Sequence, residues 1–254
     1  MNNLIEYKPS EELRRYIDSF WFFRNTQNEQ VDFPVVPDGC SDIIFYLNNS
    51  KKLEGIDDTF VTGVMESAQL IPILKNMESF GIRFKPGVLS YLLEVDMSTL
   101  ADNMVELSEL NRDIYKKIKV DKFADDLEII KSAEEQLNQL CSKSFFEDNF
   151  LKIVEALVNN PNEIIEEVAK MHSWSIKKIE RVFHKRIGIT PKKFARIMRF
   201  QSAHKKISRE GITNLIKIAM TTGYFDQAHF NREYKKMVGY NPSSETMSIL
   251  YNEK

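Results

Sequence analysis

Two helical segments near the C-terminus carry side chains that are chemically equipped to contact nucleic acid. In the segment that starts at Ser175, apolar residues repeat at helical spacing on one face and basic residues occupy the other. The segment that starts at Asp226 has the same arrangement. The outward side chains are Lys177, Lys178, Glu180, Arg181, His184 and Lys185, then Gln227, Ala228, Asn231, Arg232, Lys235 and Lys236.

These residue types match the groups that base pairs expose in the major groove. Arginine pairs bidentately with guanine, Gln or Asn with adenine, and Glu with cytosine, while Ala can touch a thymine methyl group. Nearby Lys192, Lys193, Lys205 and Lys206 favour contacts with phosphate. The alternative is that each basic face is simply solvated, and for Lys205 and Lys206 both interpretations stay open.

The elements that must position these side chains form a repeated pattern. A short helix over 163–171, a turn and a longer helix over 175–187 precede a connecting helix from Pro191 to about Ile207. The pattern returns as 214–220, a turn at Gly223 and 226–238. Each copy is a helix-turn-helix whose second helix is short enough to enter a major groove. The predicted helix caps are Asn162, Ser175, Thr190, Thr213 and Asp226, and the predicted helix ends are Gly188, Gly211 and Gly239.

Charge is distributed unevenly along the 254 residues, although the formal net charge is only −2. From residue 149 onward, 19 Lys and Arg face 10 Asp and Glu, a net of +9. The first 148 residues hold 16 bases and 27 acids, a net of −11. Such asymmetry between halves favours a nucleic-acid partner for the basic half.

The acidic half contains no histidine, because His172, His184, His204 and His229 all lie in the basic half. This excludes a histidine-based metal centre, or a Cys–His or Ser–His catalytic pair, built within the acidic half. The two cysteines exclude a multi-cysteine zinc site and fit a reducing cytoplasm. We therefore expect no catalytic residues, no metal and no cofactor, and the absence of a run of ~20 apolar residues predicts no membrane span.

The acidic half is predicted to be rich in β-strands. Short runs of Phe, Ile and Val alternate with turn residues, which favours an antiparallel sandwich or barrel. Helical periodicity follows from Val88, so the predicted fold class is a two-domain α+β chain with an all-α C-terminal domain. The predicted strands cover 20–23, 33–36, 42–47, 60–64, 70–74 and 79–84.

Residues 163–247 resemble the DNA-binding domain of AraC/XylS-type bacterial transcription regulators. The likeness rests on Ala169, Ser175, Ile179, Arg181, Phe183, Gly188 and Pro191, then on Ile218, Ala219, Gly223, Tyr224, Asp226, Gln227, His229, Phe230, Arg232, Tyr234, Gly239 and Pro242. It implies two helix-turn-helix units, joined by a long helix, that contact successive major grooves. One departure is that Ser243-Ser244-Glu245-Thr246 stands where the family has an aromatic and then a basic residue, which puts the end of the last helix in doubt.

The resemblance also assigns roles to individual positions. The residues at the family's base-contact positions are Lys177, Glu180, Arg181, Gln227, Ala228 and Arg232. The predicted flanking or phosphate contacts are Lys178, His184, Lys185, Lys192, Lys193, His229, Asn231, Lys235 and Lys236.

Segments 36–45 and 81–87 resemble the N-terminal domain of one AraC-type subgroup, which is taken to be a sensing or dimerising module. Asp42 and Arg83 are candidate effector anchors, with a strand-edge ion pair as the alternative. Cys40 is expected to be a small core residue, and the alternative of a redox sensor would need an exposed, acidified thiol.

Together these patterns predict a cytoplasmic, sequence-specific DNA-binding transcription regulator. Residues 1–142 would form the regulatory domain and residues 145–254 the DNA-binding domain. The alternatives are a non-specific architectural DNA-binding protein and a regulator whose N-terminal domain is also an enzyme. The expected partner is double-stranded DNA. Three further partners stay open: a small-molecule effector, a second copy of the chain in a homodimer and, for an activator, RNA polymerase. The sequence also leaves open the identity of the effector, the operator sequence and the choice between activation and repression.

Overall fold

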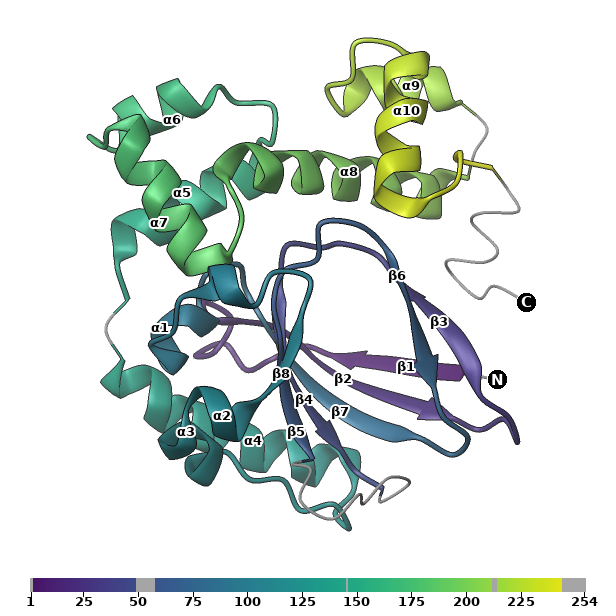
Figure 1. The fold of residues 1–254 in the computed structure, drawn as a ribbon, viewed down its shortest axis with the longest axis vertical. Helices are drawn as coiled ribbons and strands as arrows, with labels where there is room; N and C mark the ends of the chain where they lie inside the picture. The colour runs from purple at the N-terminus through teal and green to yellow at the C-terminus, as the bar shows by residue number, and fades with distance from the viewer. Residues whose placement is uncertain (1, 49–57, 145, 212–213, 244–254) are drawn as a thin grey trace.

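The computed structural model describes residues 2–48, 58–144, 146–211 and 214–243. A β-rich N-terminal half precedes a helical C-terminal half, which confirms the predicted fold class (Figure 1). Thr213 and residues 244–246, on which two of the sequence predictions fall, lie outside the described residues. Within these residues, none of the helices has the length and apolar character needed to cross a membrane.

The described strands form two antiparallel sheets. In the larger sheet the order is β1 (Asn2–Tyr7), β2 (Ile17–Asn25), β7 (Glu78–Phe84), β4 (Ser41–Tyr46), β5 (Thr59–Thr62) and β8 (Met104–Glu106). The smaller sheet pairs β3 (Val31–Val35) with β6 (Gln69–Ile73). Strands β2 to β7 confirm the six predicted strands, whereas β1 and β8 were not predicted, since one is half polar and the other has three residues.

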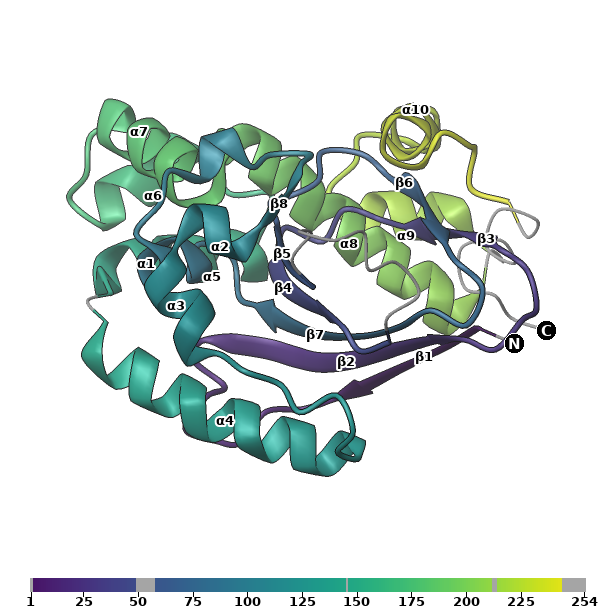
Figure 2. The ribbon, with the colours of Figure 1, turned by 60° about the horizontal axis from the view of Figure 1, so that its bottom comes forward.

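The two faces of the large sheet bury different neighbours. Phe20, Phe22, Phe80 and Ile82 point to one face and share a hydrophobic cluster with α4 (Asp126–Lys143), which lies along that face in Figure 2. The other face carries Trp21 and Phe23, which pack against the small sheet. Among the described residues, β1 and β8 lie at the edges of the large sheet and the small sheet packs on one of its faces, which corresponds to the sandwich among the predicted β-rich arrangements.

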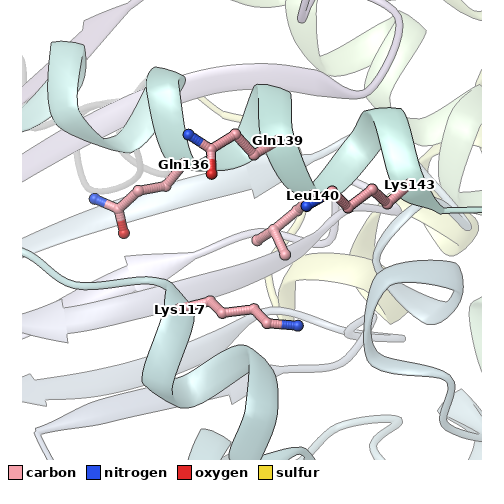
Figure 3. Close-up of a pocket in the computed structure, with 5 residues that line it drawn as sticks. All are labelled: Lys117, Gln136, Gln139, Leu140 and Lys143. Carbon is pink, nitrogen blue, oxygen red and sulfur yellow. The ribbon is translucent and has the colours of Figure 1, made fainter.

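Short helices connect the sheet to α4. They are α1 (Leu89–Leu93), the 3-10 helix η1 (Met97–Thr99), α2 (Leu107–Leu110) and α3 (Arg112–Lys117). A shallow groove of about 180 Å³ runs between α3 and α4 (Figure 3). Its lining residues are Lys117, Gln136, Gln139, Leu140 and Lys143. Because α4 covers the opposite face of the sheet from Asp42 and Arg83, this groove includes neither of the predicted effector anchors.

The C-terminal helices have their own hydrophobic cluster. They are α5 (Asp148–Asn159), α6 (Ile165–Met171), α7 (Ile176–Ile187), α8 (Pro191–Glu210), α9 (Leu215–Thr221) and α10 (Gln227–Val238). Val64 and Tyr91 of the N-terminal half belong to this cluster, and Phe146 packs against the clusters of both halves. The predicted division, between residues 142 and 145, begins in the last turn of α4, ends before α5 and stays a prediction.

Gly81 provides the space that Trp21 needs on the sheet. The two residues are cross-strand partners, and a Cβ at Gly81 would overlap the indole ring. We expect Gly81→Ala to lower the free energy of unfolding by about 1–3 kcal/mol, measured by urea denaturation, since overpacking in a core costs this much. In a Trp21→Ala background the same substitution should cost almost nothing. An equal cost in both backgrounds would show that the indole is not the cause.

Candidate DNA-binding surface and effector anchors

The first helix-turn-helix unit consists of α6 and α7. Helix α7 begins after Ser175, whose hydroxyl accepts a hydrogen bond from the Lys178 backbone N–H at 3.2 Å. It ends at Gly188, whose φ of +98° suits glycine. Ile179 and Phe183 are fully buried, which turns the opposite face outward. The predicted cap at Ser175 and the predicted end at Gly188 are confirmed.

The second unit consists of α9 and α10. The Asp226 carboxylate accepts from the His229 backbone N–H at 2.6 Å, and the helix ends at Gly239 with φ +88°. Buried Phe230, Tyr234, Met237 and Val238 form its inward face, as predicted. Helix α9 is capped by Asn214, whose side-chain oxygen accepts from the Lys217 N–H at 2.9 Å, so the cap lies one residue after the position that the sequence predicts.

Helix α8 joins the two units and packs against both. The Thr190 hydroxyl caps it and Pro191 occupies its first turn, as predicted. Near its start, Phe194 makes an edge contact with Phe183, with ring centroids 5.7 Å apart. Further along, Phe200 lies 5.3 Å from Tyr234. The relative placement of α7 and α10 is therefore set by buried aromatic contacts along one helix.

Asn162 gives a second, direct link between the units. The sequence predicts it as a helix cap, but that prediction is wrong: α6 begins after Ile164 without a side-chain cap. The Asn162 amide instead donates to the Thr222 carbonyl oxygen at 3.4 Å and fills the space beside Gly223, whose φ is +85°. Nothing in the local spacing marks this contact, because its partner is 60 residues away.

The residues predicted to read bases project from the two units. Lys177, Glu180, Arg181, Ala228 and Arg232 are exposed, and Gln227 is half-buried. Within the described residues, no hydrogen bond or ion pair engages the charged side chains among them. These groups are therefore available to a ligand, although their roles as base contacts stay predictions.

The predicted phosphate contacts divide into free and engaged side chains. Lys192, Lys235, His184 and Lys185 are exposed. The pKa of Asp96 is lowered mainly by the hydrogen bond from the Ser98 hydroxyl and, to a smaller extent, by the charges of His184 and Lys185. Others already have partners. Lys178 lies over Trp174 and near Glu147, Lys193 pairs with Glu66, Lys236 pairs with Glu233, and the His229 Nδ1 accepts from Phe225 N–H. Asn231 is half-buried, and within the described residues its Oδ1 has no hydrogen-bond partner.

The N-terminal half contacts this surface at several points. The Arg186 guanidinium stacks over Tyr91 at 3.9 Å and donates to the Ser90 carbonyl at 3.3 Å. The Lys193 ammonium lies 2.7 Å from Glu66, and the Ala68 N–H donates to the Met237 carbonyl at 2.6 Å. Both units therefore touch the N-terminal half. These contacts were not predicted, because they join residues far apart in the chain.

The candidate effector anchors lie on the sheet face that also carries Trp21. Asp42 and Arg83 are cross-strand partners on β4 and β7, inside the sheet and not at its edge. Arg83 Nε lies 3.4 Å from an Asp42 oxygen, so the ion pair of the alternative interpretation is present. Burial raises the pKa of the Cys40 thiol well above its usual range, which disfavours the acidified thiol that a redox sensor needs.

Family comparisons agree with this geometry. Residues 168–246 match the family model described as a helix-turn-helix domain, and residues 5–106 match one described as a domain of unknown function, DUF6597. An uncharacterized HTH-type transcriptional regulator of Haemophilus influenzae is 29% identical over 85 residues, which cover 34% of this chain and 28% of that protein. The probable thc operon regulatory protein of Rhodococcus erythropolis is 29% identical over 92 residues, covering 34% and 27%.

Among solved structures, ToxT from Vibrio cholerae has a TM-score of 0.45 at 11% identity, covering 92% of this chain and 98% of that one. The chain spans little more than a quarter of the length of the two curated relatives. The C-terminal half is a double helix-turn-helix module. It matches a helix-turn-helix family model and two transcription regulators, and it resembles the DNA-binding domain of AraC-type regulators.

His204 gives the helical C-terminal half a pH-dependent stability. Its ring is buried between α8 and α10, 3.1 Å from the Tyr234 hydroxyl, and burial followed by the charge of Lys205 lowers its pKa to about 4. The unfolded chain therefore binds a proton between roughly pH 6.5 and pH 4 that the folded chain does not.

Stability should consequently fall as the pH falls through this window, by up to about 1.4 kcal/mol per pH unit. We expect His204→Phe to flatten that slope in denaturation measured from pH 7 to pH 4. The exposed His184→Gln should leave the slope unchanged. If both variants keep the wild-type slope, His204 is not the titrating group.

Proposed function

We propose that this protein is a sequence-specific DNA-binding transcription regulator that reads two successive major grooves. The observation that carries the proposal is that both second helices, α7 and α10, present exposed polar side chains while their apolar faces fix them to α8. A 20-residue helix is about 30 Å long, comparable to the ~34 Å between successive major grooves on one face of DNA.

In this proposal the domain of residues 1–142 controls the domain of residues 145–254. The support is the set of contacts between the halves, above all the pairing of Lys193 with Glu66, which occupies a predicted phosphate contact. A small-molecule effector, a homodimer and contact with RNA polymerase belong to the same proposal. An effector would act by favouring one arrangement of the halves over another.

Footprinting on genomic fragments selected by the protein tests this function. A regulator should protect a defined operator with contacts in two adjacent major grooves. Uniform protection that does not depend on sequence would instead support the alternative of a non-specific architectural protein.

Arg181 and Arg232 supply the sharpest test of base reading. If each pairs with a guanine, Arg181→Ala and Arg232→Ala should each lose ~1–3 kcal/mol of discrimination at one base-pair position and little elsewhere. Binding to a library of operator variants measures this. Lys235→Ala is the control, because loss of a phosphate contact should weaken binding to every sequence alike. A uniform loss for either arginine would reassign it to phosphate.

Glu66 tests whether the N-terminal half competes with DNA for Lys193. Glu66→Gln removes the carboxylate that lies 2.7 Å from the Lys193 ammonium, so DNA binding should become tighter. Because Lys193 would then contact one more phosphate, the slope of log affinity against log salt concentration should steepen by about 0.9. Glu135→Gln, at an exposed position on α4, removes the same charge without touching Lys193. Equal effects of both variants would indicate general electrostatic screening in place of a specific contact.

A further inference from the structure

Phe225 has the most exposed large apolar side chain in the described part of the helical half, at 89%. It lies in the turn between α9 and α10, directly before Asp226, whose carboxylate caps α10. What distinguishes it from other exposed apolar side chains is this place. It stands at the N-terminal end of a helix whose outward residues are predicted to read bases.

The turns of the two helix-turn-helix units match except for one residue. In the first unit the Trp174 N–H donates to the Ala169 carbonyl oxygen at 2.9 Å, and in the second the Tyr224 N–H donates to the Ala219 carbonyl oxygen at 3.0 Å. Both aromatic side chains are buried. In the first unit the helix cap follows at once, whereas in the second Phe225 stands between the buried aromatic residue and the cap. Phe225 is therefore an additional residue whose ring neither the core nor the cap uses.

The backbone holds Phe225 in a defined position although its ring is exposed. Its N–H donates to the His229 Nδ1 at 3.4 Å. The His229 ring in turn makes an edge contact with buried Tyr224, with ring centroids 5.5 Å apart. Because the cap at Asp226 fixes the following residue, the Cα of Phe225 is positioned from both sides.

Phe225 lies at the end of α10 that would enter a major groove. Recognition helices contact base edges through their N-terminal residues. The opposite end of α10 contacts the N-terminal half, where the Ala68 N–H donates to the Met237 carbonyl oxygen at 2.6 Å. Since a 12-residue helix is ~18 Å long, that contact leaves the Phe225 end accessible to DNA.

We propose that Phe225 reads a thymine in the groove entered by α10, by packing its ring against the thymine 5-methyl group. This methyl group is the apolar feature that marks thymine in the major groove, and phenylalanine is one of the side chains that contact it. A phenyl ring has no donor for a phosphate or for a polar base edge. The inference rests on the proposed function and extends it, because it adds a specificity-determining residue to Gln227, Ala228 and Arg232.

Uracil in place of thymine tests this contact, because it keeps the base pair and removes only the methyl group. In the operator selected by the full chain, each thymine of the half-site bound by α10 is replaced in turn, and the affinity is measured at constant salt. For the wild type, one replacement should weaken binding about fourfold, the effect of one buried methyl-sized group. Phe225→Ala should bind the thymine operator at least as much more weakly and should not respond to that replacement. Phe225→Leu keeps an apolar side chain and should retain part of the response.

Phe123→Ala is the matched control. It removes a fully exposed phenyl ring three residues before α4, and α4 lies across the large sheet from α10 (Figure 2). This variant should keep both the affinity and the thymine response of the wild type.

Three results would overturn the proposal while leaving a defined operator, and hence the proposed function, intact. The first is wild-type affinity of Phe225→Ala for that operator. The second is a thymine response that persists in Phe225→Ala and vanishes in Ala228→Gly, which would assign the methyl contact to Ala228. The third is a loss of affinity in Phe225→Ala that is equal for the thymine operator and every uracil operator. Uniform protection of DNA without a defined operator would overturn the proposed function together with this inference.

Discussion

The packing of α8 against both helix-turn-helix units is the constraint on which the candidate DNA-binding surface depends. Phe194 contacts the core of the first unit and Phe200 contacts the core of the second. Both side chains are fully buried, so turning either unit about α8 would open a cavity beside them, at a cost of several kcal/mol. Asn162 adds a direct contact between the units. The spacing of the two exposed helix faces is thus a consequence of core packing.

The same helix also contacts the β-rich half, so the surface and its proposed control share one structural element. Gly39 packs on α8 beside Asp38, and Arg186 at the end of α7 stacks on Tyr91. The partners from the first half include the carboxylate of Glu66, and those from the second half include the ammonium of Lys193. The opposite net charges of the halves therefore have a local counterpart where the halves meet.

Local patterns predicted much of this architecture. Ser175, Thr190 and Asp226 cap their helices because a cap depends on residues two or three positions apart. Asn162 has an equally suitable side chain, yet its amide bonds to Thr222, since a tertiary partner replaced the local one. The strand β1 was missed for a related reason, because its register is set by pairing with β2 and not by alternation in its own sequence.

The sequence by itself determined the separation of charge, the repeat of two helix-turn-helix units and the identity of the outward side chains, because each depends on residue type and short-range periodicity. Only the tertiary structure decided which of those side chains are free. Lys193 meets Glu66 across 127 positions, and Arg83 meets Glu6, Asp38 and Asp42 from three different segments. Such pairings follow from how the sheet and α8 bring distant segments together, which no local pattern encodes.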